Sequence, residues 1–204
     1  MPARVESYNF LNRTPLESVF TPEFLQAVDT LHPVGQLTDT YNKVADATML
    51  NRMLYLDWKI TLADNDLRKV NRMCEITGID VRYPMLDDEV IDLSTRVPSR
   101  VKLPRGKLRH FYKNALRDFL PPEVLTKSKH GFGLPFGQWL KKSSRLQESI
   151  YGNLSAFKSR RVINPEFLDN LIDTHRTGHA SYYGSMIWVL AVLEEWLRQN
   201  EEDM

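Results

Sequence analysis

Residues 127–140, KSKHGFGLPFGQWL, combine basic side chains with closely spaced glycines. A lysine such as Lys129 beside Gly131 and Gly133 can reach a phosphate or a developing anion, because glycine lets the backbone approach the ligand closely. The glycine spacing matches neither the dinucleotide-binding fingerprint nor the Walker loop. A loop that enters a helix at Pro135 explains the same residues without any chemistry. On the residues alone, both interpretations stay open.

A second group of residues that could do chemistry lies between positions 64 and 72. Asp64 and Asp66 offer carboxylates that can hold Mg²⁺ or orient a base. The same acids can cap a helix predicted to begin near Asn65, where free backbone amides favour negative charge. Asp66 can also pair with Lys69 one helical turn later. The sequence therefore predicts either a site or an ordinary helix start here.

Arg82 and Asp87 flank the proline turn in the stretch VRYPMLDDEVIDL. Structural roles alone can explain both residues: Asp87 would cap the next helix, and Arg82 would pair with a nearby carboxylate. Metal binding by histidine is not predicted, because Gly178 separates His175 from His179 and ends the helix that could carry both. No serine lies in a nucleophile elbow.

Helical periodicity predicts the elements that must position these residues. A short helix begins after Thr21-Pro22-Glu23, and longer helices are expected at about 45–62, 65–77, 87–97, 105–119, 136–151, 165–178 and 181–199. Gly78 is suited to cap the second of the long helices. Residues 79–86 form the one strand-like stretch, which Pro84 cuts short. We predict a mainly α fold in a single helical unit over residues 1–204.

Composition narrows the class of protein. The 204 residues carry a formal net charge of +1, with 42% hydrophobic and 26% charged side chains. This balance predicts no nucleic-acid partner and no membrane-surface partner. The sequence has no apolar run of about 18 residues and no signal peptide at its start. Cys74 is the only cysteine, so no internal disulfide can form. We predict a soluble, cytoplasmic protein.

Four segments in this order resemble the glutamine-hydrolysing asparagine synthetase family. They are LADNDLRKVNRMCEITGIDVRYPMLDDEVIDL, RGKLRHFYKNALRDFLP, LPPEVLTKSKHGFGLPFGQWL and YGSMIWVLAVLEEWLRQN. The resemblance runs from about Tyr8 to the end of the chain. Departures are modest: Ala63 replaces the family's usual proline, Met85 its usual phenylalanine, and Asn71 stands where many members have aspartate.

The resemblance implies a fold, an activity and a set of partners. The fold would be the helical C-terminal half of an adenine-nucleotide α-hydrolase-like synthetase domain. The complete enzyme would use ATP and Mg²⁺ to adenylate the side-chain carboxylate of aspartate and release pyrophosphate. Ammonia derived from glutamine would then displace AMP. A homo-oligomer is expected, and a ligase acting on another carboxylate is the alternative within the family.

The resemblance also assigns roles to individual residues. Lys129 and Asp66 would be catalytic, Lys129 by stabilising negative charge near the adenylation step. Arg82 and Asp87 would fix the turn that shapes the pocket. The residues implied to bind nucleotide or substrate are Asp64, Asn71, Gly131 and Gly133. No metal ligand is assigned with certainty.

Two parts of the family's full chain are missing from this sequence. One is the N-terminal amidotransferase domain with its cysteine nucleophile, and the other is a Ser-Gly-Gly-x-Asp-Ser pyrophosphate loop. The sequence therefore predicts a piece of a larger enzyme that is inactive alone, or one subunit of a split amidotransferase. It could also be a non-catalytic helical interaction module. A piece separated from its nucleotide sheet should expose an apolar face, near Met53 and Trp58 or near Trp188.

Overall fold

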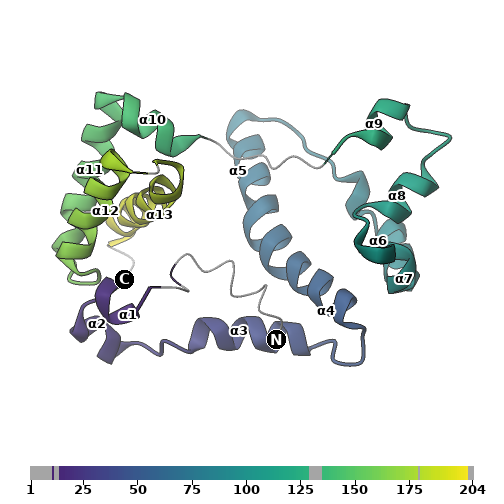
Figure 1. Cartoon of the computed structure of the whole chain (residues 1–204), viewed down its shortest axis with the longest axis horizontal. Coiled ribbons are helices and arrows are strands. Elements are labelled where there is room, and N and C mark those ends of the chain that lie inside the picture. The colour runs from purple at the N-terminus through teal and green to yellow at the C-terminus, as the bar shows by residue number, and fades with distance from the viewer. Residues whose placement is uncertain (1–10, 12–13, 129–134, 179, 202–204) are drawn as a thin grey trace. The chain divides into compact units, whose positions relative to one another are not determined.

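The computed structural model describes residues 11, 14–128, 135–178 and 180–201, and side chains 180–182 are left out of the description. These residues form helices and connecting segments, with no strand among them beyond a single antiparallel bridge between Phe20 and Ile163. The predicted mainly α fold is therefore confirmed (Figure 1). None of the helices described is long and apolar enough to cross a membrane.

The helices gather into two compact units, one over residues 33–130 and one built from the segments before and after it. The prediction that residues 1–204 form one domain stays a prediction. The first unit begins with α3 (His32–Asn42), and its further elements are α4 (Met49–Leu56), η2 (Asp57–Leu67), α5 (Arg68–Thr77), η3 (Pro84–Leu86), α6 (Asp88–Arg96), α7 (Ser99–Lys102), η4 (Pro104–Gly106), α8 (His110–Ala115) and α9 (Pro122–Thr126).

One long helical run crosses the first unit from residue 49 to residue 77. Thr48 caps its start by accepting a hydrogen bond from the Asn51 amide at 3.4 Å. Gly78 ends the run in the left-handed region with φ of 67°, as predicted. The predicted break between residues 62 and 65 is wrong, because η2 is a π-helix that joins α4 to α5 (Figure 1). Its sequence contains neither proline nor glycine to stop the helix.

Three other predicted elements differ from the structure. Of the helix expected at 105–119, only α8 (His110–Ala115) is helical in the structure. It begins late because Arg105 and Arg109 adopt left-handed backbone with φ of 51° and 57°. The helix expected at 136–151 is interrupted at Ser143, whose hydroxyl oxygen caps the next helix by accepting from the Leu146 amide at 3.3 Å. The strand-like stretch contains no strand and ends in the 3-10 turn η3.

The second unit packs three helices against α13. Its elements are α1 (Leu16–Val19), α2 (Pro22–Ala27), α10 (Phe136–Lys142), α11 (Ser144–Lys158), α12 (Pro165–Thr177) and α13 (Ala180–Gln199). Helices α10, α11 and α12 all contact α13. The fully buried side chains include Leu140, Leu154, Phe157, Leu168 and Ile187, which form one hydrophobic core. The predicted helices at 165–178 and 181–199 are confirmed within one or two residues.

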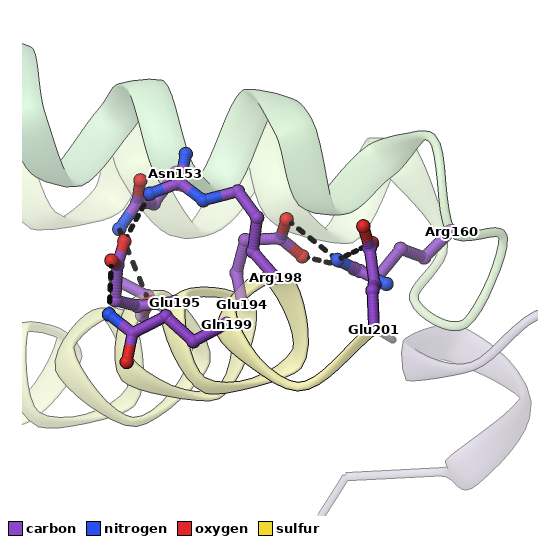
Figure 2. Close-up of polar contacts among 8 residues, drawn as sticks. Asn153, Arg160, Glu194, Glu195, Arg198, Gln199 and Glu201 are labelled. Carbon is purple, nitrogen blue, oxygen red and sulfur yellow. Dashed lines mark hydrogen bonds and ion pairs between the residues drawn. The ribbon is translucent and has the colours of Figure 1, made fainter. Parts of the chain in front are cut away.

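Polar groups fasten the end of α13 to α11 and the turn after it (Figure 2). Arg160 forms ion pairs with the buried Glu194 and, at 2.7 Å, with Glu201. Asn153 donates a hydrogen bond to Glu195 at 3.3 Å, and Gln199 donates another at 2.8 Å. Every carboxylate of this cluster therefore has a charged or amide donor, which compensates for its partial removal from water.

Candidate functional site

Asp64 and Asp66 lie inside the π-helix η2, on the exposed surface of the long helical run. Asp66 pairs with Lys69, with 2.9 Å between carboxylate oxygen and ammonium nitrogen, and Asp64 lies 3.8 Å from the Arg68 guanidinium. The pairing of Asp66 with Lys69 is confirmed. The helix-start interpretation is wrong, because η2 runs directly into α5 and no side-chain cap hydrogen bond is made where α5 begins.

Asn71 lies on α5, on the exposed side of the helix. Its side-chain carbonyl accepts a hydrogen bond of 2.7 Å from the Tyr83 hydroxyl. This bond ties the extended segment before η3 to the helix that carries the acidic pair. Sequence reasoning did not select Tyr83, since nothing local to an R-Y-P stretch shows which helix its hydroxyl will reach.

Arg82 and Asp87 have the structural partners that the sequence predicted. The Arg82 guanidinium pairs with Asp80 at 3.0 Å, and both side chains are strongly exposed. Asp87 caps α6 by accepting a hydrogen bond from the Glu89 amide at 3.0 Å. The capping and pairing interpretations are confirmed. A role in shaping a substrate pocket stays a prediction.

Lys129, Gly131 and Gly133 fall outside the described residues, so their predicted roles stay predictions. Before them, the Lys127 carbonyl accepts a hydrogen bond from the Lys113 ammonium at 3.3 Å. After them, Gly137 is buried in α10, and its carbonyl accepts a 2.9 Å hydrogen bond from the Nε2 of His175. The third glycine of the GFGLPFG stretch therefore serves helix packing.

His175 is a buried polar residue that sequence reasoning examined only as a metal ligand. It is fully buried, and its Nδ1 accepts a hydrogen bond of 3.3 Å from the Tyr151 hydroxyl. With Nε2 donating to the Gly137 carbonyl, both ring nitrogens have hydrogen-bond partners, and the ring joins α12 to α10 and α11. Within the described part of the chain, no cluster of histidine, cysteine and acidic groups could hold a metal ion.

The acids and bases between residues 64 and 75 form ion pairs one helical turn apart. Because half or more of each of these side chains is exposed, the ion pairs contribute only about 0–1 kcal/mol each. A phosphate group could therefore replace the carboxylate partner of Arg68, Lys69 or Arg72 at a small cost in free energy. A hydrated Mg²⁺ could likewise replace the cationic partner of Asp64 or Asp66. Each of these carboxylates can give one oxygen ligand to a hydrated Mg²⁺ that takes its other ligands from water and phosphates, and neither belongs to a cluster of described residues that would hold the ion by itself.

Comparison with known proteins finds matches over most of the chain. The family model for asparagine synthase matches residues 3–198. A Bacillus subtilis protein named asparagine synthetase [glutamine-hydrolyzing] 1 is 24% identical over 167 residues, which are 81% of this chain and 26% of that protein. Putative glutamine-hydrolysing asparagine synthetases of Mycobacterium bovis and Mycobacterium tuberculosis are 26% identical over 145 residues, or 71% of this chain and 22% of theirs. The chain spans about a quarter of the length of these relatives. No solved structure matches it.

Proposed function

The chain belongs to the asparagine synthase family, and from that premise we propose that it supplies the helical part of an ATP-dependent ligase that forms a side-chain amide. The single observation that carries the proposal is the family match across residues 3–198. The exposed acids and cations of η2 and α5 support it, because their chemistry suits a nucleotide with its metal.

The proposed reaction has two steps. An oxygen of the aspartate side-chain carboxylate attacks the α-phosphorus of ATP, and the bond to the β-phosphate oxygen breaks to release pyrophosphate. Ammonia then attacks the acyl carbon, and the bond to AMP breaks. Mg²⁺, when bound, would neutralise phosphate charge, and Asp64 or Asp66 would hold it. Lys129 would stabilise the charge that develops on the leaving group or the tetrahedral intermediate.

Further residues would support this chemistry from the same unit. Asn71, held by Tyr83, would orient nucleotide or substrate, and Gly131 and Gly133 would let the backbone approach it. Arg82 and Asp87 would keep the proline turn in place. The phosphate-binding loop and the source of ammonia would come from a partner domain or subunit. The relatives are named glutamine-hydrolysing, so glutamine is the nitrogen donor that we propose.

A non-catalytic docking module is the second candidate, and the surface of α13 favours it. Trp188, Val192 and Trp196 leave 46%, 44% and 53% of their area exposed, and their spacing places them on one face of the helix. The predicted apolar face near Trp188 is therefore present, whereas Met53 and Trp58 are only partly exposed. A protein that worked by docking alone would use such a face without any ATP chemistry.

Two measurements test the proposal. A tagged copy of the chain, recovered from its source cells with whatever it assembles with, should release pyrophosphate from Mg-ATP only when aspartate is added. Glutamate serves as the matched control acid. An assembly that releases no pyrophosphate with any carboxylic acid would support the docking module, and release with another acid but not with aspartate would replace aspartate as the substrate. The chain alone should not bind Mg-ATP in calorimetry, and micromolar binding would contradict the need for a partner.

A further inference from the structure

The first unit contains a cavity of about 660 Å³ that is separate from the acidic surface of residues 64–72. Its volume falls within the roughly 300–1,000 Å³ typical of small-molecule sites. Its walls come from the long helical run, α6 and α8. The side chains that give it an apolar character include Leu54, Tyr55, Trp58, Val90, Leu93 and Phe111.

A single positive charge interrupts this apolar lining. Lys102, at the end of α7, is the only charged residue among the described residues that line the cavity. Its ammonium donates a 2.8 Å hydrogen bond to the side-chain carbonyl of Asn51, which lines the cavity as well. Asn51 is neutral, and within the described chain no carboxylate forms an ion pair with Lys102.

The Lys102 ammonium has lost part of its hydration without gaining an anionic partner among the described residues. Burial lowers the pKa of Lys102, as expected when a cation loses water without gaining an anion. The polar neighbours Ser94 and Thr95 direct their hydroxyl protons to the Ile91 and Asp92 carbonyls, so they bring no negative charge to the cavity. A ligand that brought a carboxylate to Lys102 would supply the missing charge, and an apolar body would cover the aromatic wall.

We propose that this cavity binds a small amphipathic carboxylate, with its hydrocarbon body against Trp58, Leu93 and Phe111 and its carboxylate paired with Lys102. The chemistry differs from that of the proposed ligase substrate, since aspartate has no apolar body to bury. The site therefore stands independently of the proposed reaction. The class of ligand is an alkyl or aryl monocarboxylic acid.

The test compares three probes of equal chain length on the full 204-residue chain: octanoate, octanol and octylammonium, below their micelle concentrations. Methyl NMR shifts of Val90 and Leu93 report binding at the cavity. Octanoate should bind about tenfold more tightly than octanol, the ratio expected when a partly buried ion pair replaces a neutral contact. Octylammonium should bind most weakly.

Two variants separate the charge from the apolar wall. Lys102→Met should abolish the preference for octanoate over octanol while octanol still binds. Lys102→Arg should keep the preference, and Lys107→Met, an exposed lysine of the same unit outside the cavity lining, should leave all three affinities unchanged. Far-UV circular dichroism confirms that each variant folds.

Other outcomes would overturn the proposal. Equal binding of octanoate and octanol to the natural chain would show that the cavity binds apolar chains without recognising a carboxylate. Failure of all three probes to move the Val90 and Leu93 signals would show that the cavity binds no ligand of this class. If those signals moved only when the remaining parts of the enzyme were added, the cavity would be a packing surface.

Discussion

Gly184 in α13 faces Gly137 in α10 so closely that a Cβ atom on Gly184 would lie 2.4 Å from the Cα of Gly137. The neighbour is backbone, which cannot swing aside as a flexible side chain would. We expect Gly184→Ala to force α10 away from α13 and to destabilise the second unit by about 2–4 kcal/mol. Urea unfolding followed by the fluorescence of Trp139 and Trp188 measures the loss.

Gly152 provides the matched control for that substitution. It lies in α11 of the same unit, is exposed, and would place a Cβ in open space. Gly152→Ala should therefore stabilise the helix by roughly 0.5–1 kcal/mol, because alanine loses less backbone freedom on folding. Equal effects of the two substitutions would show that α10 and α13 do not meet at these glycines.

Local signals predicted several helix ends correctly. Thr21 and Asn164 cap the helices that follow them, and Gly78 ends a helix in left-handed backbone. Each of these roles depends on backbone groups within a few residues, so the sequence contains all that is needed to foresee it.

Roles that depend on a distant partner could not be predicted in this way. Gly137 is the third glycine of the stretch that suggested phosphate binding, and its Cα is approached closely by Gly184, 47 positions later along the chain. His175 likewise needs Tyr151 and Gly137 to become a packing residue. At the candidate site, Asp64 and Asp66 drew attention through charge, while Tyr83 gave no local sign of its bond to Asn71.

The buried carboxylate of Glu194 should stabilise the second unit through Arg160. Removing one partner of a buried ion pair leaves the other without compensation, which costs far more than losing an exposed pair. We expect Glu194→Ala to lower the urea midpoint clearly, although Glu201 still pairs with Arg160. The double variant Arg160→Met with Glu194→Met should recover part of the loss, since it leaves no buried charge unpaired, and the Glu201 carboxylate that loses Arg160 is exposed to water.

Asp169→Asn is the control for that pair. Asp169 is exposed and pairs with Lys158 in the same unit. Its replacement should change the free energy of unfolding by no more than about 0.5–1 kcal/mol. A loss as large as that of Glu194→Ala would mean that burial does not distinguish the two pairs.

Glu195 should make the stability of the second unit depend on pH. The hydrogen bond from Gln199, followed by the charge of Arg198 and the bond from Asn153, lowers the pKa of Glu195. A carboxyl with a lowered folded pKa stabilises the fold at pH values above its unfolded pKa of about 4.3. That contribution is lost as the pH falls through the lowered folded pKa.

Glu195→Gln tests this dependence, because glutamine keeps the size of the side chain and loses its charge. The variant should be less stable than the natural chain at neutral pH, and the difference should vanish in acid below the folded pKa. Urea midpoints measured at pH steps from neutral down to about 2 cover the window. A constant difference over that range would assign the effect to packing.

Lys129→Ala, made in the complete enzyme, should impair adenylation far more than folding. A fixed cation that stabilises developing charge typically contributes about 3 kcal/mol to the barrier, which is roughly a hundredfold in rate. Lysine side chains are rarely buried in protein cores, so stability should change by no more than about 0.5 kcal/mol. Aspartate-dependent pyrophosphate release and urea unfolding measure the two effects separately.

Lys127→Ala is the matched control, because it removes a lysine of the same segment to which no catalytic role is assigned. Lys127 is exposed, and its hydrogen bonds with Lys113 and Glu123 are made by its backbone carbonyl and amide, which an alanine preserves. Its loss should therefore leave both rate and stability nearly unchanged. Lys129→Arg should restore only part of the rate, because a planar guanidinium cannot occupy the place of a compact ammonium. If Lys127 proved essential and Lys129 dispensable, the match of this loop to the family and the role assigned to Lys129 would both be wrong.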